Sequence, residues 1–249
     1  MNPRQAITRG QSRQVDRRAV QEYGMSGLVL MENAGRGTAD VLCRLLAEAE
    51  DRPEGAGLPR GPSPASGAAG PIVVCCGKGN NAGDGFVVAR HLDLRGHPLR
   101  VLVWAEPDEL TGDAGVNFEI LRLSGVPLEI MGNRHDPERL AGHLAGAAWV
   151  VDALLGTGAR GEPRPPLGAV IDALNAAPAA KLAIDLPSGL DCDTGEAARH
   201  TIRAAETCTF VAAKRGFLAP GAKQYTGRVH VLDIGAPRKL VEEVIAAGE

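Results

Sequence analysis

Apolar, often β-branched runs recur along most of the chain and predict the strands of a sheet. Hydrophobicity within each run is continuous rather than alternating, which is typical of strands covered on both faces and therefore of a mostly parallel sheet. The runs occupy residues 71–76, 98–104, 127–131, 148–154, 181–186, 207–212 and 228–233.

Segments with helical periodicity lie between the earlier of these runs. They span residues 85–96, 112–125, 136–147 and 167–177. Strands that alternate with helices predict the α/β class, and here a three-layer α/β/α sandwich built on a Rossmann-like, mostly parallel sheet.

Two further helices are predicted before the first strand, over residues 12–23 and 26–50. Ser12 is expected to cap the first of them and Gly24 to stop it. Residues 51–70 are rich in Pro, Gly and Ser, which predicts a flexible insertion. Because two helices are too few to fold alone, we place no domain boundary there and expect a single domain over the whole chain, residues 1–249.

Composition narrows the possible functions. Aromatic residues make up 3% of the chain and the net charge is −3, which argues against a nucleic-acid surface. No apolar run approaches the roughly 18 residues of a membrane helix, and the first residues lack the apolar stretch of a secretory signal. The cysteines form no C-x-x-C motif and lie among apolar neighbours, so we expect reduced thiols and a cytoplasmic protein. They are Cys43, Cys75, Cys76, Cys192 and Cys208.

Polar residues gather where four of the predicted strands end. In a parallel sheet, ligands bind beyond the carboxyl ends of the strands. The first strand runs into the loop GKGNNAGDG at residues 77–85, and Asp152 lies near the end of a later strand. Asp185 and Ser188 follow the next strand, and Lys214 follows the one after it. Packing alone does not account for four such ends, so we expect a composite ligand site.

The glycine loop is compatible with more than one interpretation. Gly77, Gly79 and Ala82 formally match the dinucleotide pattern G-x-G-x-x-G/A. The acidic partner of that pattern is expected about 20 residues further on, whereas Glu106 comes late and Asp84 would repel a pyrophosphate. A P-loop is disfavoured because no Gly-Lys-Ser/Thr closes the loop. A glycine-rich turn without a ligand stays open at this point.

Five motifs stand in order along the chain: LMENAG at 30–35, NNAGDG at 80–85, VDALLGTGARGEP at 151–163, AIDLPSGLDCDTGE at 183–196 and AAKRGF at 212–217. Together they resemble the NAD(P)H-hydrate epimerases, the family of the YjeF N-terminal domain. The similarity extends from about residue 8 to residue 235. The family's loop usually reads GNNGGDG, and Ala82 replaces one of its glycines here.

The resemblance implies an activity on damaged cofactors. The substrate is hydrated NADH or NADPH (NADHX or NADPHX), which carries a hydroxyl on the ring carbon beside the nicotinamide nitrogen. Loss of that hydroxyl leaves a flat iminium, and water can return to either face, so the R and S epimers interconvert. The resemblance also implies a homodimer and, as functional partner, a separate NAD(P)H-hydrate dehydratase.

This reaction needs a group that protonates the departing hydroxyl and takes a proton from the returning water. Asp185 is expected to be that acid/base, at a strand end where burial can raise its pKa; the alternative is an Asp that caps the following turn. Lys214 matches the family's strand-end lysine and is expected to orient or polarise the substrate. A salt bridge to a neighbouring acid is the alternative for Lys214.

The resemblance further implies one potassium ion per subunit, bound by Asn81, Asp152 and Ser188. Amide, carboxylate and hydroxyl oxygens are hard ligands, which suit such an ion better than zinc. The resemblance places the substrate's phosphates against two glycine-rich loops, whose exposed N–H groups can bind an anion. Besides Asp185, the implied substrate-binding residues are Asn80, Asn81, Ala82, Gly83, Asp84, Gly156, Thr157, Gly158, Ala159, Arg160, Gly161 and Glu162.

Two other functions stay open. A non-catalytic scaffold on the same fold is the main alternative, although a scaffold has no physical reason to keep the acid, the lysine and the cation ligands together. An NAD-dependent dehydrogenase is disfavoured by the missing acid after the second strand. We expect His91 to serve in packing or capping, and Asp191 and Asp193 to shape a turn, because their spacing does not fit a calcium-binding EF-hand loop.

Overall fold

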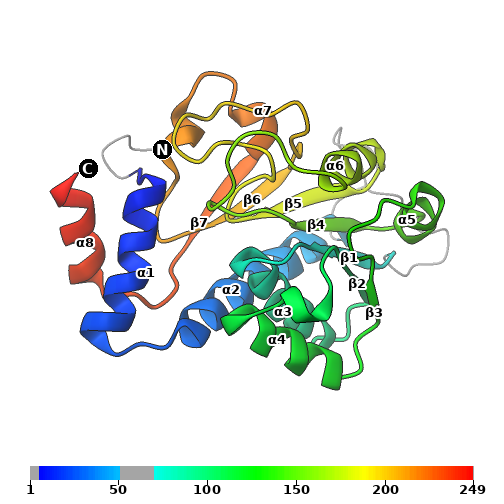
Figure 1. The fold of residues 1–249 in the computed structure, drawn as a ribbon, viewed down its shortest axis with the longest axis horizontal. Helices are drawn as coiled ribbons and strands as arrows, with labels where there is room; N and C mark the ends of the chain where they lie inside the picture. The colour runs from blue at the N-terminus through cyan, green and yellow to red at the C-terminus, as the bar shows by residue number, and fades with distance from the viewer. Residues whose placement is uncertain (1–5, 51–69, 249) are drawn as a thin grey trace.

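Seven parallel strands form one sheet in the computed structural model (Figure 1), which describes residues 6–50 and 70–248. Their order is β3-β2-β1-β4-β5-β6-β7. All seven predicted strands are confirmed, whereas the predicted insertion lies outside the described residues except for Gly70. The strands are β1 (Ile72–Cys76), β2 (Leu99–Val103), β3 (Leu128–Ile130), β4 (Trp149–Ala153), β5 (Ala180–Ile184), β6 (Glu206–Phe210) and β7 (Arg228–Leu232).

Helices cover both faces of the sheet (Figure 1). They are α1 (Arg9–Tyr23), α2 (Gly27–Glu50), α3 (Asn80–Asp93), α4 (Gly112–Leu123), α5 (Pro137–Leu144), α6 (Leu167–Ala176), α7 (Lys223–Thr226) and α8 (Arg238–Ala247), with 3-10 turns η2 (Pro107–Glu109) and η3 (Arg215–Leu218). No helix in the described ranges is both long and apolar enough to cross a membrane.

The core is divided by the alternation of side chains along each strand. Val74 of β1 belongs to an apolar cluster with residues of α2, α3 and α4, whereas its neighbour Val73 belongs to a second cluster with residues of α5 and α6. Figure 1 shows these two sets of helices on opposite sides of the sheet. The predicted three-layer α/β/α sandwich is therefore confirmed.

Helix α1 begins one turn earlier than predicted. Thr8 is its N-cap, because the Thr8 hydroxyl accepts a hydrogen bond from the Gln11 N–H at 3.2 Å and the Gln11 side chain accepts one from the Thr8 N–H at 2.9 Å. This reciprocal capping box outcompetes the predicted cap, Ser12, which lies inside the helix. Gly24 ends α1 with a φ of 66°, as predicted.

The first and last described helices pack against each other. Figure 1 shows α1 beside α8, and the Gln11 side chain donates a hydrogen bond to the Val244 carbonyl at 3.1 Å. Arg18 adds an ion pair to Glu243 at 2.8 Å. The apolar residues Val15 and Ala19 of α1 belong to the same core cluster as Leu240 and Val244 of α8, so α8 supports the inner face of α1.

Candidate active site at the switch point of the sheet

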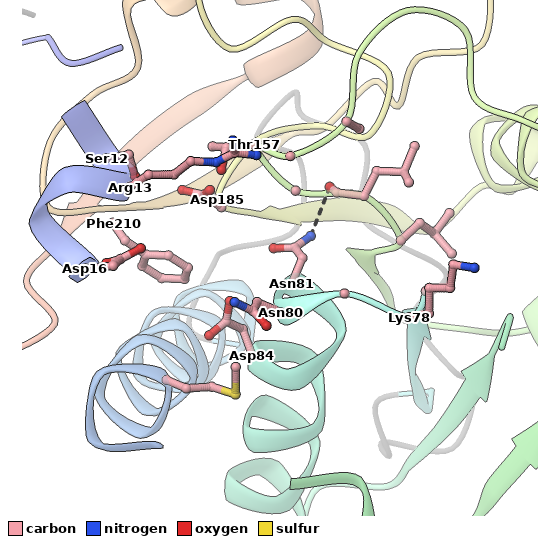
Figure 2. Close-up of a pocket in the computed structure, with 18 of the residues that line it drawn as sticks. Ser12, Arg13, Asp16, Lys78, Asn80, Asn81, Asp84, Thr157, Asp185 and Phe210 are labelled. Carbon is pink, nitrogen blue, oxygen red and sulfur yellow. Dashed lines mark hydrogen bonds between the residues drawn. The ribbon is translucent and has the colours of Figure 1, made fainter. Parts of the chain in front are cut away.

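A pocket opens where the strand order reverses between β1 and β4 (Figure 2). The chain leaves these two strands toward opposite halves of the sheet, which creates a crevice at their carboxyl ends. Gly77 follows β1, and a Cβ there would lie 2.1 Å from the Leu154 carbonyl oxygen. Only glycine lets the two strand ends approach so closely. The pocket has a volume of about 1170 Å³.

Parts of the chain that lie far apart in the sequence form the walls of this pocket. They include α1 with Asp16, α2 with Met31, the start of α3 with Asn81, the loop that follows β4, and the ends of β5 and β6 with Asp185 and Phe210. Helix α3 begins after Gly79, which has no side chain to cap it. Its first N–H groups therefore stay available to an anion, which the helix dipole also favours.

Asp185 occupies a strained turn directly after β5. Its φ is 66°, in the left-handed region that is costly for residues with a side chain. The Leu186 N–H bonds to the Ile184 carbonyl at 2.8 Å, which makes Asp185 the centre of a γ-turn. The Asp185 N–H donates to the Cys208 carbonyl of β6 at 2.7 Å, and the carboxylate lines the pocket (Figure 2).

A second turn of the same kind follows β6. Val211 has a φ of 69°, and the Ala212 N–H bonds to the Phe210 carbonyl at 2.8 Å. A β-branched residue in this conformation is rare. Two adjacent strand ends thus store backbone strain at one pocket, an arrangement typical of functional sites.

Lys214 is fully buried and does not line the pocket. Its Nζ lies 2.8 Å from Asp185 Oδ1 and donates a hydrogen bond to the Phe210 carbonyl at 3.0 Å. The Thr209 hydroxyl lies 3.4 Å from the same carboxylate oxygen. The salt bridge that sequence reasoning left as the alternative is thus present, and it fixes the Asp185 carboxylate.

Two other carboxylates share the pocket with Asp185. Asp84 on α3 is buried, and its pKa lies well above the usual range because of burial and then because of the negative charges of Asp185 and Asp16. Asp16 on α1 is open to water in the pocket. Desolvation by the surrounding protein and then the negative charge of Asp185 raise the pKa of Asp16 to about 6, while the positive charge of Lys214 opposes this shift.

Asp16 was missed by the sequence analysis, which considered only the carboxyl ends of strands. A usable signal exists in α1, where polar residues recur at helical spacing beside the apolar face. Ser12, Arg13, Asp16 and Arg17 all line the pocket. Arg9 fixes this helix to the opposite side of the site through hydrogen bonds from its guanidinium to the Ala159 carbonyl and the Asp191 carboxylate, at 3.2 and 3.0 Å.

The three residues predicted to bind potassium lie in one hydrogen-bonded cluster. The Ser188 hydroxyl donates to Asp152 Oδ1 at 2.6 Å, and the Ser188 N–H donates to Oδ2 at 2.8 Å. The Leu155 backbone joins this pair to Asn81: its N–H donates to Ser188 Oγ at 2.9 Å, and its carbonyl accepts from Asn81 Nδ2 at 3.0 Å. Asn81 Oδ1 is buried and has no partner within the described part of the chain.

This donor set fits an alkali ion. Asp152 is fully buried, and burial raises its pKa to about 6 although hydrogen bonds from Ser188 and Leu154 oppose the shift. A cation would offset both the buried carboxylate and the unpaired amide oxygen of Asn81. The donors here would be the amide oxygen of Asn81, the carboxylate of Asp152, the hydroxyl of Ser188 and the Leu155 carbonyl.

Most of the predicted substrate-binding residues line the pocket, including Asn80, Asn81, Asp84 and all of residues 156–162. Ala82 and Gly83 do not: Ala82 is buried in the core, and Gly83 packs against Met31. Basic side chains also stand in the lining, beside the acidic ones, and can contact a phosphate-bearing ligand. The basic residues are Arg13, Arg17, Lys78, Arg160 and Arg164.

The model of the YjeF-related protein N-terminus matches residues 27–216. The chain belongs to this YjeF-related family. A protein of Pirellula staleyi named NAD(P)H-hydrate epimerase is 43% identical to it over 99% of each chain. One of the same name from Rhodopirellula baltica is 39% identical over 93% of this chain and 84% of its own length.

Other members of the YjeF-related family are longer. The bifunctional NAD(P)H-hydrate repair enzyme Nnr of Pyrobaculum aerophilum is 40% identical over 91% of this chain, which covers 41% of that protein. The fold is shared with the crystal structure of yeast ynu0, YNL200c, at a TM-score of 0.75 and 22% identity, over 96% of this chain and 93% of that one. Helix α1, with its pocket residues, precedes the segment that the family model matches.

The residues assigned structural roles from the sequence behave as expected. His91 lies on α3 and pairs with Glu32 of α2 at 2.7 Å. The Asp191 carboxylate accepts hydrogen bonds from the N–H groups of Asp193 and Thr194, both at 2.9 Å, and so shapes a turn. Cys75 and Cys76 are free thiols, fully buried on opposite faces of β1.

Proposed function

We propose that this protein interconverts the R and S epimers of hydrated NADH and NADPH. The observation that carries the proposal is the carboxylate of Asp185, which a strained turn and the buried Lys214 hold at the wall of a large pocket. The names of the two full-length relatives supply the substrate class.

Asp185 acts as the acid and base of the reaction. Its carboxyl group protonates the ring hydroxyl, the C–O bond breaks, and the lone pair of the ring nitrogen forms the iminium while water departs. In the reverse direction, the same group accepts a proton from water that adds to the ring on its own side. Lys214 holds the carboxylate in position by its ion pair at 2.8 Å and does not contact the substrate.

The phosphates of the substrate bind to the N-terminus of α3 and to residues 156–162, which line the pocket together; helix N-termini and glycine-rich turns of this kind bind anions. One potassium ion per subunit binds to Asn81, Asp152 and Ser188. When bound, it supplies a positive charge that balances the buried Asp152 carboxylate next to the phosphate loops. The unpaired Asn81 Oδ1 supports this part of the proposal.

Two partners belong to the proposal. A separate dehydratase consumes one epimer, in keeping with relatives named bifunctional NAD(P)H-hydrate repair enzymes. A second copy of the chain forms a homodimer, which light scattering of the purified protein would detect as twice the 25.9 kDa mass of one chain.

The test is direct. Each epimer of hydrated NADPH is isolated and mixed with the purified protein, and chromatography follows the appearance of the other epimer with and without potassium. We expect acceleration over the spontaneous rate, and loss of that acceleration in Asp185→Ala. Interconversion at the spontaneous rate with the wild-type protein would favour the scaffold alternative.

A further inference from the structure

Epimerisation poses a problem that one carboxyl group does not solve. The hydroxyl leaves one face of the ring, and water must return to the other. A single acid/base on one side of a bound ring serves only that side unless the ring turns over in the pocket. If the proposed function holds, a second group must act on the other face of the ring.

Asp16 lines the same pocket as Asp185. Figure 2 shows Asp16, Asp84 and Asp185 reaching the pocket from three elements, namely α1, α3 and the end of β5. The same pocket holds the unpaired, buried Asn81 Oδ1, which independently indicates a ligand there. Helix α1 is held in place by Arg9, whose guanidinium bonds to the phosphate-loop carbonyl of Ala159 at 3.2 Å.

Burial distinguishes Asp16 from Asp84. Asp84 is 9% exposed and packs at the crossing of α2 and α3, where burial raises its pKa well above the usual range and leaves it less access to water than Asp16 has. Asp16 is open to water in the pocket, where it can exchange a proton with solvent. Its pKa of about 6 lies near neutral pH, which is the range in which a group serves as both acid and base.

We propose that Asp16 and Asp185 are paired acid/base residues that act on opposite faces of the nicotinamide ring. In one direction, the protonated carboxyl of Asp16 donates its proton to the hydroxyl, the C–O bond breaks, and water leaves on that side. Water then adds to the iminium on the other side and gives its proton to the ionised Asp185. The pair ends with its one proton moved from Asp16 to Asp185, ready for the reverse reaction or for exchange with solvent.

Oxygen exchange separates the two faces. Each epimer is incubated with the enzyme in water enriched in oxygen-18, and mass spectrometry and chromatography follow label uptake and configuration together. In Asp16→Asn we expect epimerisation to fall about 100-fold or more. For one epimer, the one whose hydroxyl faces Asp185, label uptake without inversion should fall less than about 10-fold. The reason is that loss of the hydroxyl and return of water on the face beside Asp185 need only Asp185.

A matched control lies on the same helix. Glu22 is an exposed carboxylate of α1 that pairs with Arg18 and lies outside the pocket, so Glu22→Gln should leave both measurements unchanged. Asp16→Asn should fold, because it removes a like charge near Asp185; thermal unfolding checks this.

Three outcomes decide the proposal. The proposal is supported if Asp16→Asn retains oxygen-18 exchange for one epimer but not for the other. Wild-type epimerisation by Asp16→Asn, or an equal fall of exchange and epimerisation for both epimers, overturns it. A wild-type protein that accelerates neither process would instead overturn the proposed function itself.

Discussion

At the scale of single residues, the ion pair between Asp185 and Lys214 joins catalysis to stability. Asn, like Asp, tolerates the positive φ of this turn, so Asp185→Asn should keep the backbone yet leave the fully buried Lys214 charge unpaired. We expect loss of catalysed epimerisation and a fall of about 3 kcal/mol in the free energy of unfolding, measured in urea. The double variant with Lys214→Met should recover much of that stability but no activity. Additive losses of stability would contradict this coupling.

The cation ligands give a second prediction at this scale. Potassium should stabilise the wild-type protein relative to choline, by about 1.4 kcal/mol at ten times the dissociation constant. Asn81→Ala should lose that difference, since it removes the unpaired Oδ1. Asn117→Ala is the control: Asn117 is also buried, but its amide bonds to the Asp113 carbonyl at 3.1 Å. This variant should be less stable than the wild type yet still be stabilised by potassium. Thermal unfolding in matched salts measures both.

The residues that sequence reasoning found are those that follow strands. Asn81, Asp152 and Asp185 could be predicted to lie near one another because the carboxyl ends of parallel strands meet at one edge of the sheet. The spacing of α1 gives Asp16 a polar helix face but not a place in the pocket, because that place depends on the packing of α1 and on the contacts of Arg9 with residues far along the chain. Periodicity gives no warning of such long-range contacts.

At the scale of elements, the crossing of α2 and α3 depends on the absence of a side chain at Gly35. A Cβ there would lie 2.5 Å from Val87 Cβ and 2.9 Å from the Asp84 carbonyl oxygen. We expect Gly35→Ala to cost about 1–3 kcal/mol of unfolding free energy, because the two helices must separate. Gly142→Ala on α5 is the control: its added Cβ meets nothing within 4 Å, so it should stabilise by about 0.5–1 kcal/mol. If urea unfolding shows that Gly35→Ala and Gly142→Ala change the free energy of unfolding in the same direction, the crossing does not depend on Gly35.

All seven strands were predictable because buried parallel strands are short, continuous apolar runs. The order of the strands in the sheet could not be predicted, since periodicity is a local property and does not indicate which strands pair. Helix α8 was also missed: its ten residues are too few for a helix that is stable alone, and it depends on packing against α1. Helix α1 was found, but its start was misplaced because Thr8 and Gln11 form the capping box.

At the scale of the whole molecule, the pocket depends on the contact between the first and last described helices. Leu240 of α8 is fully buried in the cluster that contains Val15 and Ala19 of α1. Leu240→Ala should lower the free energy of unfolding by about 2–4 kcal/mol. It should also speed amide hydrogen exchange in residues 9–23 and reduce epimerisation, because Asp16 loses its fixed position. Leu174→Ala on α6 removes an equally buried leucine from the cluster on the opposite face, so it should cost a similar amount without loosening α1. If the amide groups of α1 are equally protected from hydrogen exchange in the two variants, α8 does not support the pocket.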